Sequence, residues 1–425
     1  MVVETETKFR TFRAFKHRNY RLYFLGQSVS LVGTWMQKTA VSWVIYTLTH
    51  STFMLGLTMF ASMFPSFVLS LIGGVISDRY NRYKVLLTTQ IASLIQALLL
   101  ALLILLKHYA VWEIISLSAV LGIINAFDVP ARQSLVYEMV EDKDDLPNAL
   151  ALNSSMVNLS RIFGPALAGI VLETLGDGSC FLLNALSFVA VIISLLLMKL
   201  APYVKKEHKK NVIGELKEGM AYIKRTPSIA FVLVMLALVS LLVLPFSTLI
   251  PYYAKDVFKG NASTFGVIDS FIGLGAFSGA IFLASLKPGT DLKRILFINT
   301  LVLGAGLVLF SHENSYPLAL VFVTITGFGM MSQITVSNTL IQTIVEPNMR
   351  GRVISYYAMA FFGIQPIGGL FVGFLSKWVG TTNTLLLQGI CALILGLLHW
   401  RYLHRAKVKQ KQILMSDEHN LHPAY

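Results

Sequence analysis

Apolar stretches about as long as the ~20 residues that a helix needs to cross a bilayer recur along the whole chain of 425 residues. Nearly every charged residue lies between them, and only 13% of the residues are charged. Lipid offers no hydrogen-bond partner to the backbone, so such stretches must form helices unless they alternate like barrel strands, which these do not. The pattern predicts an all-α, polytopic membrane protein.

The number of apolar stretches is about twelve, and an even number places both termini on one side of the membrane. A hydrophilic connection follows the sixth stretch, so we expect two pseudo-symmetric bundles of six transmembrane helices each. The expected spans cover approximately residues 21–47, 52–77, 84–106, 111–138, 147–174, 179–200, 227–254, 262–286, 292–311, 316–341, 352–376 and 382–402.

The hydrophilic connection and the two hydrophilic ends of the chain define five regions. We expect a basic N-terminal segment at residues 1–20, a first bundle at 21–200, a linker at 201–226, a second bundle at 227–402 and a tail at 403–425. Apolar residues of the linker share one helical face, which predicts an amphipathic helix at the membrane surface. These residues are Val212, Ile213, Leu216, Met220 and Ile223.

Lys and Arg are spread very unevenly over the loops. The loops after the second, sixth, eighth and tenth spans and both terminal segments are rich in them, whereas the loops of the other side hold only Lys107, Lys255, Lys259 and Lys377. Because positive loops stay on the cytoplasmic side, we expect both termini in the cytoplasm. The formal charge of +13 therefore reflects topology, and no nucleic-acid partner is expected.

Three phenylalanines recur at every third residue of the basic N-terminal segment, at Phe9, Phe12 and Phe15. This spacing predicts a short helix that lies on an anionic membrane surface. A merely solvated tail is the alternative.

The most specific motif is GGVISDRYNRYK, residues 73–84, between the second and third spans. Glycines let helices approach closely, a carboxylate suits a helix N-terminus, and basic residues hold the loop inside. An ordinary positive-inside turn is the alternative. The motif comprises Gly73, Gly74, Asp78, Arg79, Arg82 and Lys84, and we group it with Glu138 at the end of the fourth span.

A second motif, SRIFGPALAG, lies at residues 160–169 in the fifth span. Small residues permit close helix contact and a proline bends the helix, which together suit a pivot. Ordinary close packing is the alternative. Its key residues are Ser160, Gly164, Pro165, Ala168 and Gly169.

These two motifs resemble the loop signature and the antiporter signature of the major facilitator superfamily, although Ser160 and Ala168 stand where the latter prefers glycine. The segments FLGQSVSLVGTWMQ, PARQSLVYEMV, ELKEGMAYIKRTP and RGRVISY extend the resemblance over nearly the whole chain. They are similar to the bacterial drug:proton antiporter branch, which contains macrolide-efflux and enterobactin-exporter relatives. The resemblance implies export coupled to inward proton flow across a bacterial inner membrane, without naming a cargo. For an outward-open state it also implies that Asp78 lies against the start of the eleventh span, near residues 351–355, and that Arg82 reaches Glu138.

Charged residues inside the expected spans are costly and usually functional. Lys38 lies in the first span, Asp128 and Arg132 share a face of the fourth, and Arg161 lies in the fifth. Asp128 is our candidate for carrying or gating the coupling proton, with a structural ion pair as the alternative. We expect Arg132, on the same face, and Arg161, at comparable depth on the neighbouring span, to favour its charged form. Asp269 lies nearer the outer end of the eighth span, and we expect it in a wet vestibule.

Aromatic and amide side chains in the first, fourth, seventh, tenth and eleventh spans are candidates for binding cargo, because they combine apolar contact with a polar group. Packing within a bundle is the alternative for each of them. The candidates are Gln27, Trp35, Gln37, Trp43, Phe246, Gln333, Asn338, Tyr356, Tyr357, Phe361 and Gln365.

Neither a metal nor a cofactor is expected. Cys180 and Cys391 fall in separate spans, the histidines are scattered, and no GxxxxGK[ST] phosphate loop occurs. We therefore expect a monomeric secondary transporter, not an enzyme, that exports a small amphipathic molecule in exchange for protons by alternating access. The alternatives are export of a siderophore or lipid-like metabolite, a non-transporting receptor and a membrane enzyme.

Overall fold

Helices account for nearly all of the chain that the computed structural model describes, residues 10–107, 109–200, 212–287 and 289–421, and these residues include no strand. The first half contains α1 (Arg18–Thr49), α2 (Thr52–Arg79), α3 (Arg82–Leu105), α4 (Val111–Met139), α5 (Leu146–Thr174) and α6 (Asp177–Leu196). The second contains α7 (Val212–Arg225), α8 (Pro227–Leu242), α10 (Ala262–Ala284), α11 (Leu292–Ser311), α12 (Tyr316–Ile344), α13 (Arg350–Ala358), α14 (Gln365–Val379) and α15 (Thr381–Leu421).

Within the described residues, eleven helical segments are long and apolar enough to cross a membrane. The remaining expected span lies in α1, which polar residues such as Gln27, Gln37 and Lys38 interrupt. With 32 residues, α1 is about 48 Å long, enough to cross a bilayer. It packs along α5 and α6. The protein is therefore a multi-pass membrane protein with the expected two sets of six spans.

Two spans of the second half are broken. The seventh consists of α8, a 3-10 turn (η3, Leu244–Leu249), α9 (Ile250–Tyr252) and a π-helical turn (η4, Tyr253–Val257). The eleventh consists of α13, a π-helical turn (η5, Met359–Gly363) and α14. Pro245, Pro251 and Pro366 each lack a backbone N–H, which accounts for breaks in the helical hydrogen bonding near them.

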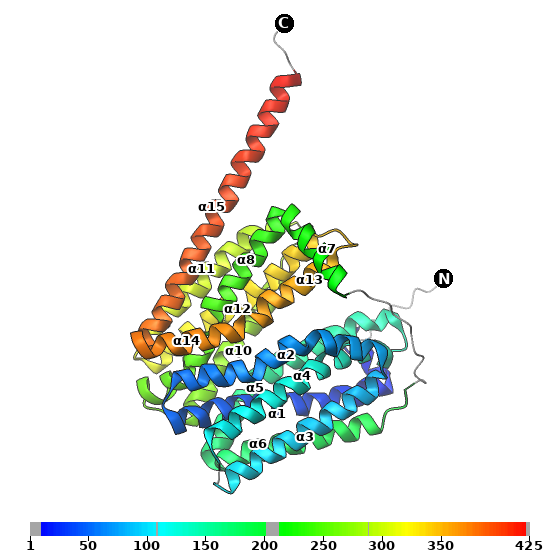
Figure 1. Cartoon of the computed structure of the whole chain (residues 1–425), viewed down its shortest axis with the longest axis vertical. Helices are drawn as coiled ribbons and strands as arrows, with labels where there is room; N and C mark the ends of the chain where they lie inside the picture. The colour runs from blue at the N-terminus through cyan, green and yellow to red at the C-terminus, as the bar shows by residue number, and fades with distance from the viewer. Residues whose placement is uncertain (1–9, 108, 201–211, 288, 422–425) are drawn as a thin grey trace, which may run out of the picture.

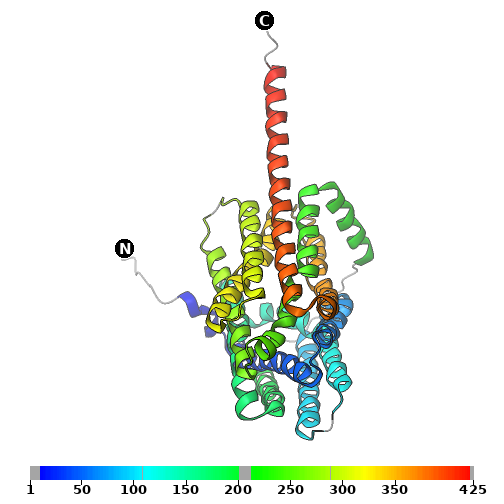
Figure 2. The same cartoon turned by 90° about the vertical axis from the view of Figure 1, so that its left-hand side faces the viewer.

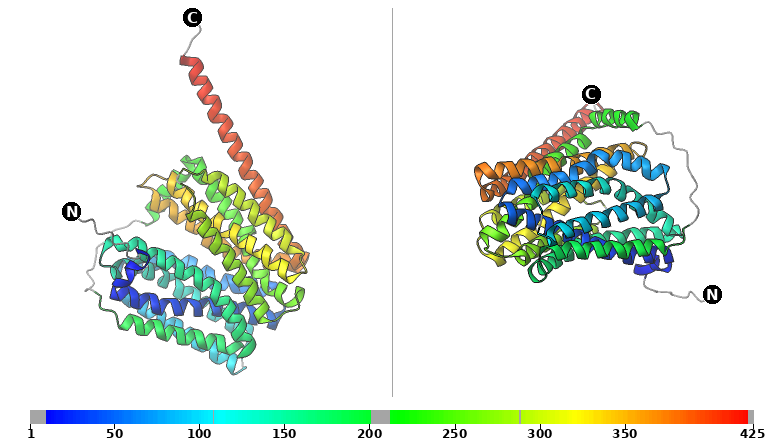
Figure 3. Two further views of the ribbon diagram at one scale, coloured as in Figure 1. Left: turned by 180° about the vertical axis from the view of Figure 1, so that it is seen from behind. Right: turned by 60° about the horizontal axis from the view of Figure 1, so that its bottom comes forward.

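The helices form two bundles that meet through two helix pairs. We call α1–α6 the first bundle and α8–α15 the second. Extensive contacts join α5 to α10 and α2 to α14 (Figure 1). The two bundles touch at the end that holds Thr52 and Glu173, here called the closed end, and part toward the end that holds α7 (Figure 3).

Backbone meets backbone across both helix pairs. A Cβ atom added at Gly266 of α10 would lie 2.3 Å from the Pro165 carbonyl oxygen of α5. At Gly56 of α2 it would lie 2.3 Å from the Gly369 carbonyl oxygen of α14. Glycine at these positions is therefore what allows the bundles to approach so closely.

The N-terminal segment contains a short helix, as the sequence predicts, and this helix packs on protein, while its expected contact with a membrane surface stays a prediction. Residues Arg10–Lys16 form a 3-10 helix that docks on the first bundle. Arg13, Lys16 and His17 surround the buried carboxylate of Asp145 at 3.1, 2.5 and 3.1 Å. A buried carboxylate is costly without partners, so these three side chains stabilise Asp145 and hold the segment against α5. Phe9 lies outside the described residues.

The linker contains a helix, as the sequence predicts, but this helix packs on protein. In α7, the backbone carbonyl of Leu216 accepts a hydrogen bond from the Tyr356 hydroxyl at 2.9 Å. Glu218 pairs with Arg352 of α13 at 2.6 Å, and Ile223 is buried. Met220, expected on the same apolar face, is 38% exposed.

The last helix is longer than the expected span. Helix α15 continues from the second bundle to Leu421, well beyond residue 402, and projects from the rest of the molecule (Figure 2). Residues 401–421 contain neither Gly nor Pro and are rich in Lys, Arg, Gln and Leu, which favour helix. The expected tail therefore begins as a continuation of the last span.

Candidate functional site

A group of charged and aromatic side chains lies where the two bundles begin to part. We call Trp35, Lys38, Arg161 and Asp269 the central site. The Lys38 ammonium and the Arg161 guanidinium both lie over the Trp35 ring, 4.8 and 5.2 Å from its centroid. The first bundle thus brings two cations to one aromatic ring.

The second bundle contributes the carboxylate of this site. Asp269 of α10 accepts a hydrogen bond from the Thr39 hydroxyl of α1 at 3.2 Å. Its charge also attracts Lys38 and Arg161. The expectation that Asp269 lies apart in a vestibule is therefore wrong. Its sequence position suggested a place near the outer end of the span, but the close α5–α10 contact brings it to α1.

Lys38 is exposed although it lies deep within α1, and Arg161 and Asp269 are half-buried. All three side chains belong to helices that line the junction between the bundles. Their accessible surface therefore belongs to the space between the bundles, where a transported molecule would pass.

Asp128 lies within the first bundle, away from this site. Its carboxylate, 5% exposed, accepts hydrogen bonds from Thr89 at 2.9 Å and Gln90 at 2.7 Å. It also pairs with Arg132 at 3.2 Å. Sequence reasoning anticipated the Arg132 pair but missed the two partners on α3. Thr89 and Gln90 are polar residues in the middle of an apolar span, and this feature of the sequence could have identified them as partners.

Arg161 is not brought to Asp128, contrary to the sequence-based expectation. The carboxylate that acts on Arg161 is Asp269 of the second bundle. Helix α5 packs on α1, α6 and α10 far more than on α4, so residues at similar depth on α4 and α5 face different neighbours.

The loop motif forms the ion pair that we predicted. Arg82 pairs with Glu138 at 2.8 Å, which ties the start of α3 to the end of α4. Arg79 and Lys84 are exposed, as basic loop residues should be. The Asp78 side chain lies outside the described residues, so its expected contact with the eleventh span stays a prediction.

Only one of the two motif glycines mediates a close contact. A Cβ at Gly73 would lie 1.9 Å from the Ala126 carbonyl oxygen of α4, whereas one at Gly74 would meet nothing within 4 Å. Successive helical residues point about 100° apart, so Gly74 faces away from α4. The expectation of close packing is therefore wrong for Gly74.

The fifth-span motif lies at two helix contacts. A Cβ at Gly164 would lie 2.4 Å from Cβ of Trp35, so glycine leaves room for that tryptophan. At Gly169 it would lie 2.8 Å from Cα of Ser263 in α10. Ser160 and Ala168 are buried. The motif therefore positions the central site and joins the two bundles.

Several of the cargo candidates are packed inside a bundle. Gln37, for example, bonds to Gln96 at 3.1 Å and to Asn184 at 2.7 Å, which joins α1, α3 and α6. Amides occur in bundle cores as well as in binding sites because they link helices, so residue type alone could not separate the two roles. The buried candidates are Gln27, Gln37, Trp43, Phe246, Gln333 and Tyr357.

The other candidates keep some accessible surface. Asn338 accepts a hydrogen bond from Gln342 one turn away, and Tyr356 contacts the linker helix. Neither contact reaches the central site. The half-buried candidates are Trp35, Asn338, Tyr356, Phe361 and Gln365.

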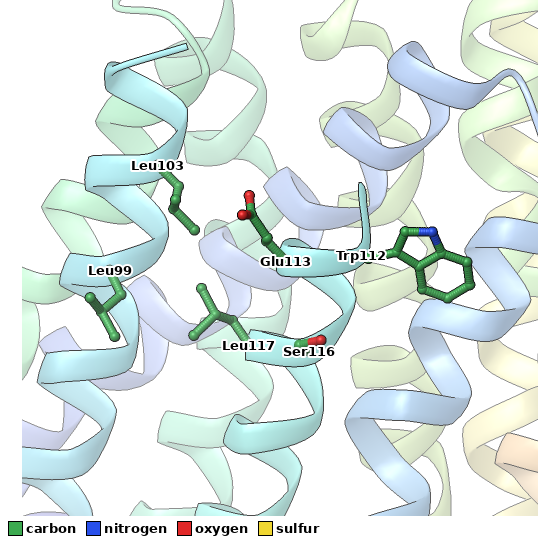
Figure 4. Close-up of a pocket in the computed structure, with 6 residues that line it drawn as sticks. All are labelled: Leu99, Leu103, Trp112, Glu113, Ser116 and Leu117. Carbon is green, nitrogen blue, oxygen red and sulfur yellow. The ribbon is translucent and has the colours of Figure 1, made fainter. Parts of the chain in front are cut away.

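A shallow groove of about 370 Å³ lies between α3 and α4. Leu99 and Leu103 of α3 line it together with Trp112 and Leu117 of α4 (Figure 4). The Glu113 carboxylate accepts a hydrogen bond from the Ala110 N–H of its own helix start at 2.8 Å. This groove is apolar and lies apart from the central site, so it suits lipid rather than cargo.

Residues 9–424 match the family model described as transmembrane secretion effector. The chain belongs to this family of the major facilitator superfamily. Three relatives span most of its length. It is 24% identical to a staphyloferrin A transporter of Staphylococcus aureus over 92% of this chain and 98% of the relative. It is 22% identical to macrolide efflux protein A of Streptococcus pyogenes over 88% and 94%. It is 24% identical to an enterobactin exporter of Escherichia coli over 90% and 91%.

Solved structures of major facilitators share the fold of this family member. A nucleoside transporter superposes with a TM-score of 0.72 at 13% identity and covers 91% of this chain and 99% of its own. A D-xylose–proton symporter superposes with a TM-score of 0.67 at 14% identity, over 91% and 96%. These similarities show that the chain shares the fold of these proteins.

Proposed function

We propose that this protein exports a small amphipathic molecule from the cytoplasm by alternating access, and that inward proton flow drives the export. The observation that carries the proposal is the junction between the bundles. Two glycine-lined helix pairs hold the closed end together, while charged side chains lie accessible where the bundles part. Rocking about this junction would expose the central site to each side in turn.

The direction of transport rests on loop charge and on the relatives. Positive loops would place both termini, and the end where the bundles part, in the cytoplasm of a bacterial cell. The site would then face the side from which an exporter loads its cargo. Two of the relatives carry efflux or export in their names, which supports export over import.

We assign the coupling proton to Asp128. It is a buried carboxylate with three side-chain partners, and protonation would weaken its pairing with Arg132. The alternative is that Asp128 stays ionised and only neutralises Arg132. Its partners all belong to α3 and α4 and would move with it, so any coupling must act through changes inside the first bundle.

Transport in proteoliposomes tests the function. Purified monomeric protein is reconstituted and screened with macrolides, siderophores and lipophilic dyes under an imposed pH gradient. We expect at least one of these to accumulate against its gradient, and nigericin, which collapses the pH gradient, to abolish the accumulation. Cargo that only equilibrates, at a rate independent of the gradient, would refute proton coupling. Movement of none of these cargo classes above empty liposomes would favour a non-transporting role.

A siderophore is the second candidate cargo. One relative, of which this chain covers 98%, is a staphyloferrin A transporter, and a further relative is an enterobactin exporter. The siderophore arm of the same screen decides between this cargo and drug-like compounds.

A further inference from the structure

The central site contains an excess of positive charge. Lys38 and Arg161 contribute two cations and Asp269 one carboxylate, which leaves a formal charge of +1. We propose that Lys38 and Arg161 together bind an anionic group of the exported molecule, and that the cargo is an amphipathic anion. This inference rests on the proposed export function and narrows its substrate class.

Both cations remain available to a ligand. Among the described residues, no carboxylate lies within 4.0 Å of the Lys38 ammonium or the Arg161 guanidinium. Asp269 attracts them from a longer distance while it accepts the Thr39 hydroxyl. Lys38 is exposed despite its depth. A charge this deep in a membrane protein calls for a partner, and an anionic cargo would supply one.

Other acidic residues near the bundle junction are already engaged. Asp256 accepts a hydrogen bond from Tyr46, and Glu173 accepts from Asn261 and Ser263 at the closed end. These carboxylates therefore do not offset the cations of the central site at contact distance.

The Trp35 ring determines the shape of the site. Two cations near one ring repel each other, and an anionic group that binds both would relieve that repulsion. The Trp35 side chain packs closely against Gly164, because a Cβ added to this glycine would lie 2.4 Å from Cβ of Trp35. Part of the ring surface stays accessible, so an aromatic or apolar body attached to the anion could pack there.

Asp269 competes with the cargo in this scheme. It attracts the same two cations, so removing its charge should strengthen anion binding. Protonation of Asp269 would likewise strengthen anion binding. The proton and the anion would then bind together, so a proton on Asp269 could not drive an exchange of anion for proton. Asp128, outside the site, therefore remains our candidate for the group that carries the coupling proton.

Equilibrium binding of three dansyl probes, measured by fluorescence in detergent with no gradient, tests the inference. Dansylglycine carries a carboxylate, dansylamide is neutral and dansylcadaverine is a cation. We expect dansylglycine to bind tightest and dansylcadaverine weakest. Lys38→Gln and Arg161→Gln should each weaken dansylglycine binding about tenfold and leave dansylamide unchanged. Lys38→Arg should retain most of the affinity, and Asp269→Asn should increase it.

Lys255 provides the matched control, since its ammonium lies 5.5 Å from the Trp43 ring centroid, outside the central site. Lys255→Gln should leave all three affinities unchanged. If wild-type protein binds dansylglycine no more tightly than dansylamide, the inference is wrong. The same holds if Lys255→Gln weakens binding as much as Lys38→Gln.

Because no gradient is present, either result would leave the proposed export untouched, whereas failure of gradient-driven transport alone would leave the anion site intact. Thermal unfolding of each variant identifies any loss of affinity that comes from misfolding. If Lys38→Gln is misfolded, the affinity of Lys38→Arg for dansylglycine decides whether the charge at this position binds the anion.

Discussion

Replacing Gly266 with alanine should separate the two bundles at the closed end. The new Cβ would lie 2.3 Å from the Pro165 carbonyl oxygen, whereas ordinary contacts begin at 3.4 Å, so α5 and α10 would have to move apart by about 1 Å. Overpacking of this kind costs about 1–3 kcal/mol. The helix itself gains up to about 1 kcal/mol from the substitution, so the cost falls on the contact between bundles.

A cost of that size shifts the balance between conformations by about 5- to 150-fold, away from the state closed at this end. Spin labels at Leu175 and Trp378, exposed residues of different bundles near the closed end, would measure it by electron–electron double resonance. We expect the population with longer distances to rise in Gly266→Ala. Gly74→Ala and Gly351→Ala are matched controls, because an added Cβ meets nothing within 4 Å at either position. Wild-type distances in Gly266→Ala, or equal shifts in the controls, would refute the reasoning.

Three further changes follow from the described contacts. Asp128→Asn should abolish pH-driven export while passive exchange remains measurable in the proteoliposome assay; wild-type rates under the gradient would exclude a coupling role, and unfolding would favour a structural pair. Glu138→Gln should lower the stability measured by thermal unfolding by no more than about 1 kcal/mol, because its pair with Arg82 is partly exposed. Asp145→Asn should release residues 10–17, seen as faster hydrogen exchange there with α10–α12 unchanged; equal protection in the variant would contradict this.

The arrangement of spans could be predicted because lipid restricts the choices to helices and loop charge orders them. The ion pair of Arg82 with Glu138 could also be predicted, since both flank short connections on one side. The position of Asp269 could not, because it depends on how deeply α10 meets α5. That depth is set by single glycine contacts, and many glycine patterns in apolar sequence look alike.

The cargo candidates show the same limit. Gln37 and Trp35 lie two residues apart on α1, and both types suit a binding site. The helix rotation turns Gln37 toward α3 and α6 and Trp35 toward α5. A rotation of this kind follows from the packing of all the neighbours, which a single sequence does not reveal.

The two π-helical turns make the bundles mechanically unequal. Both turns, Tyr253–Val257 and Met359–Gly363, belong to the second bundle, whereas α1–α6 contain none. A π turn interrupts the regular i to i−4 hydrogen bonds, so the helix can bend there at low cost. The second bundle would then change its own curvature more readily than the first. The cycle is thus asymmetric: large bending falls on the half that carries Asp269, while the half that carries the cations undergoes only the local changes that coupling through Asp128 requires.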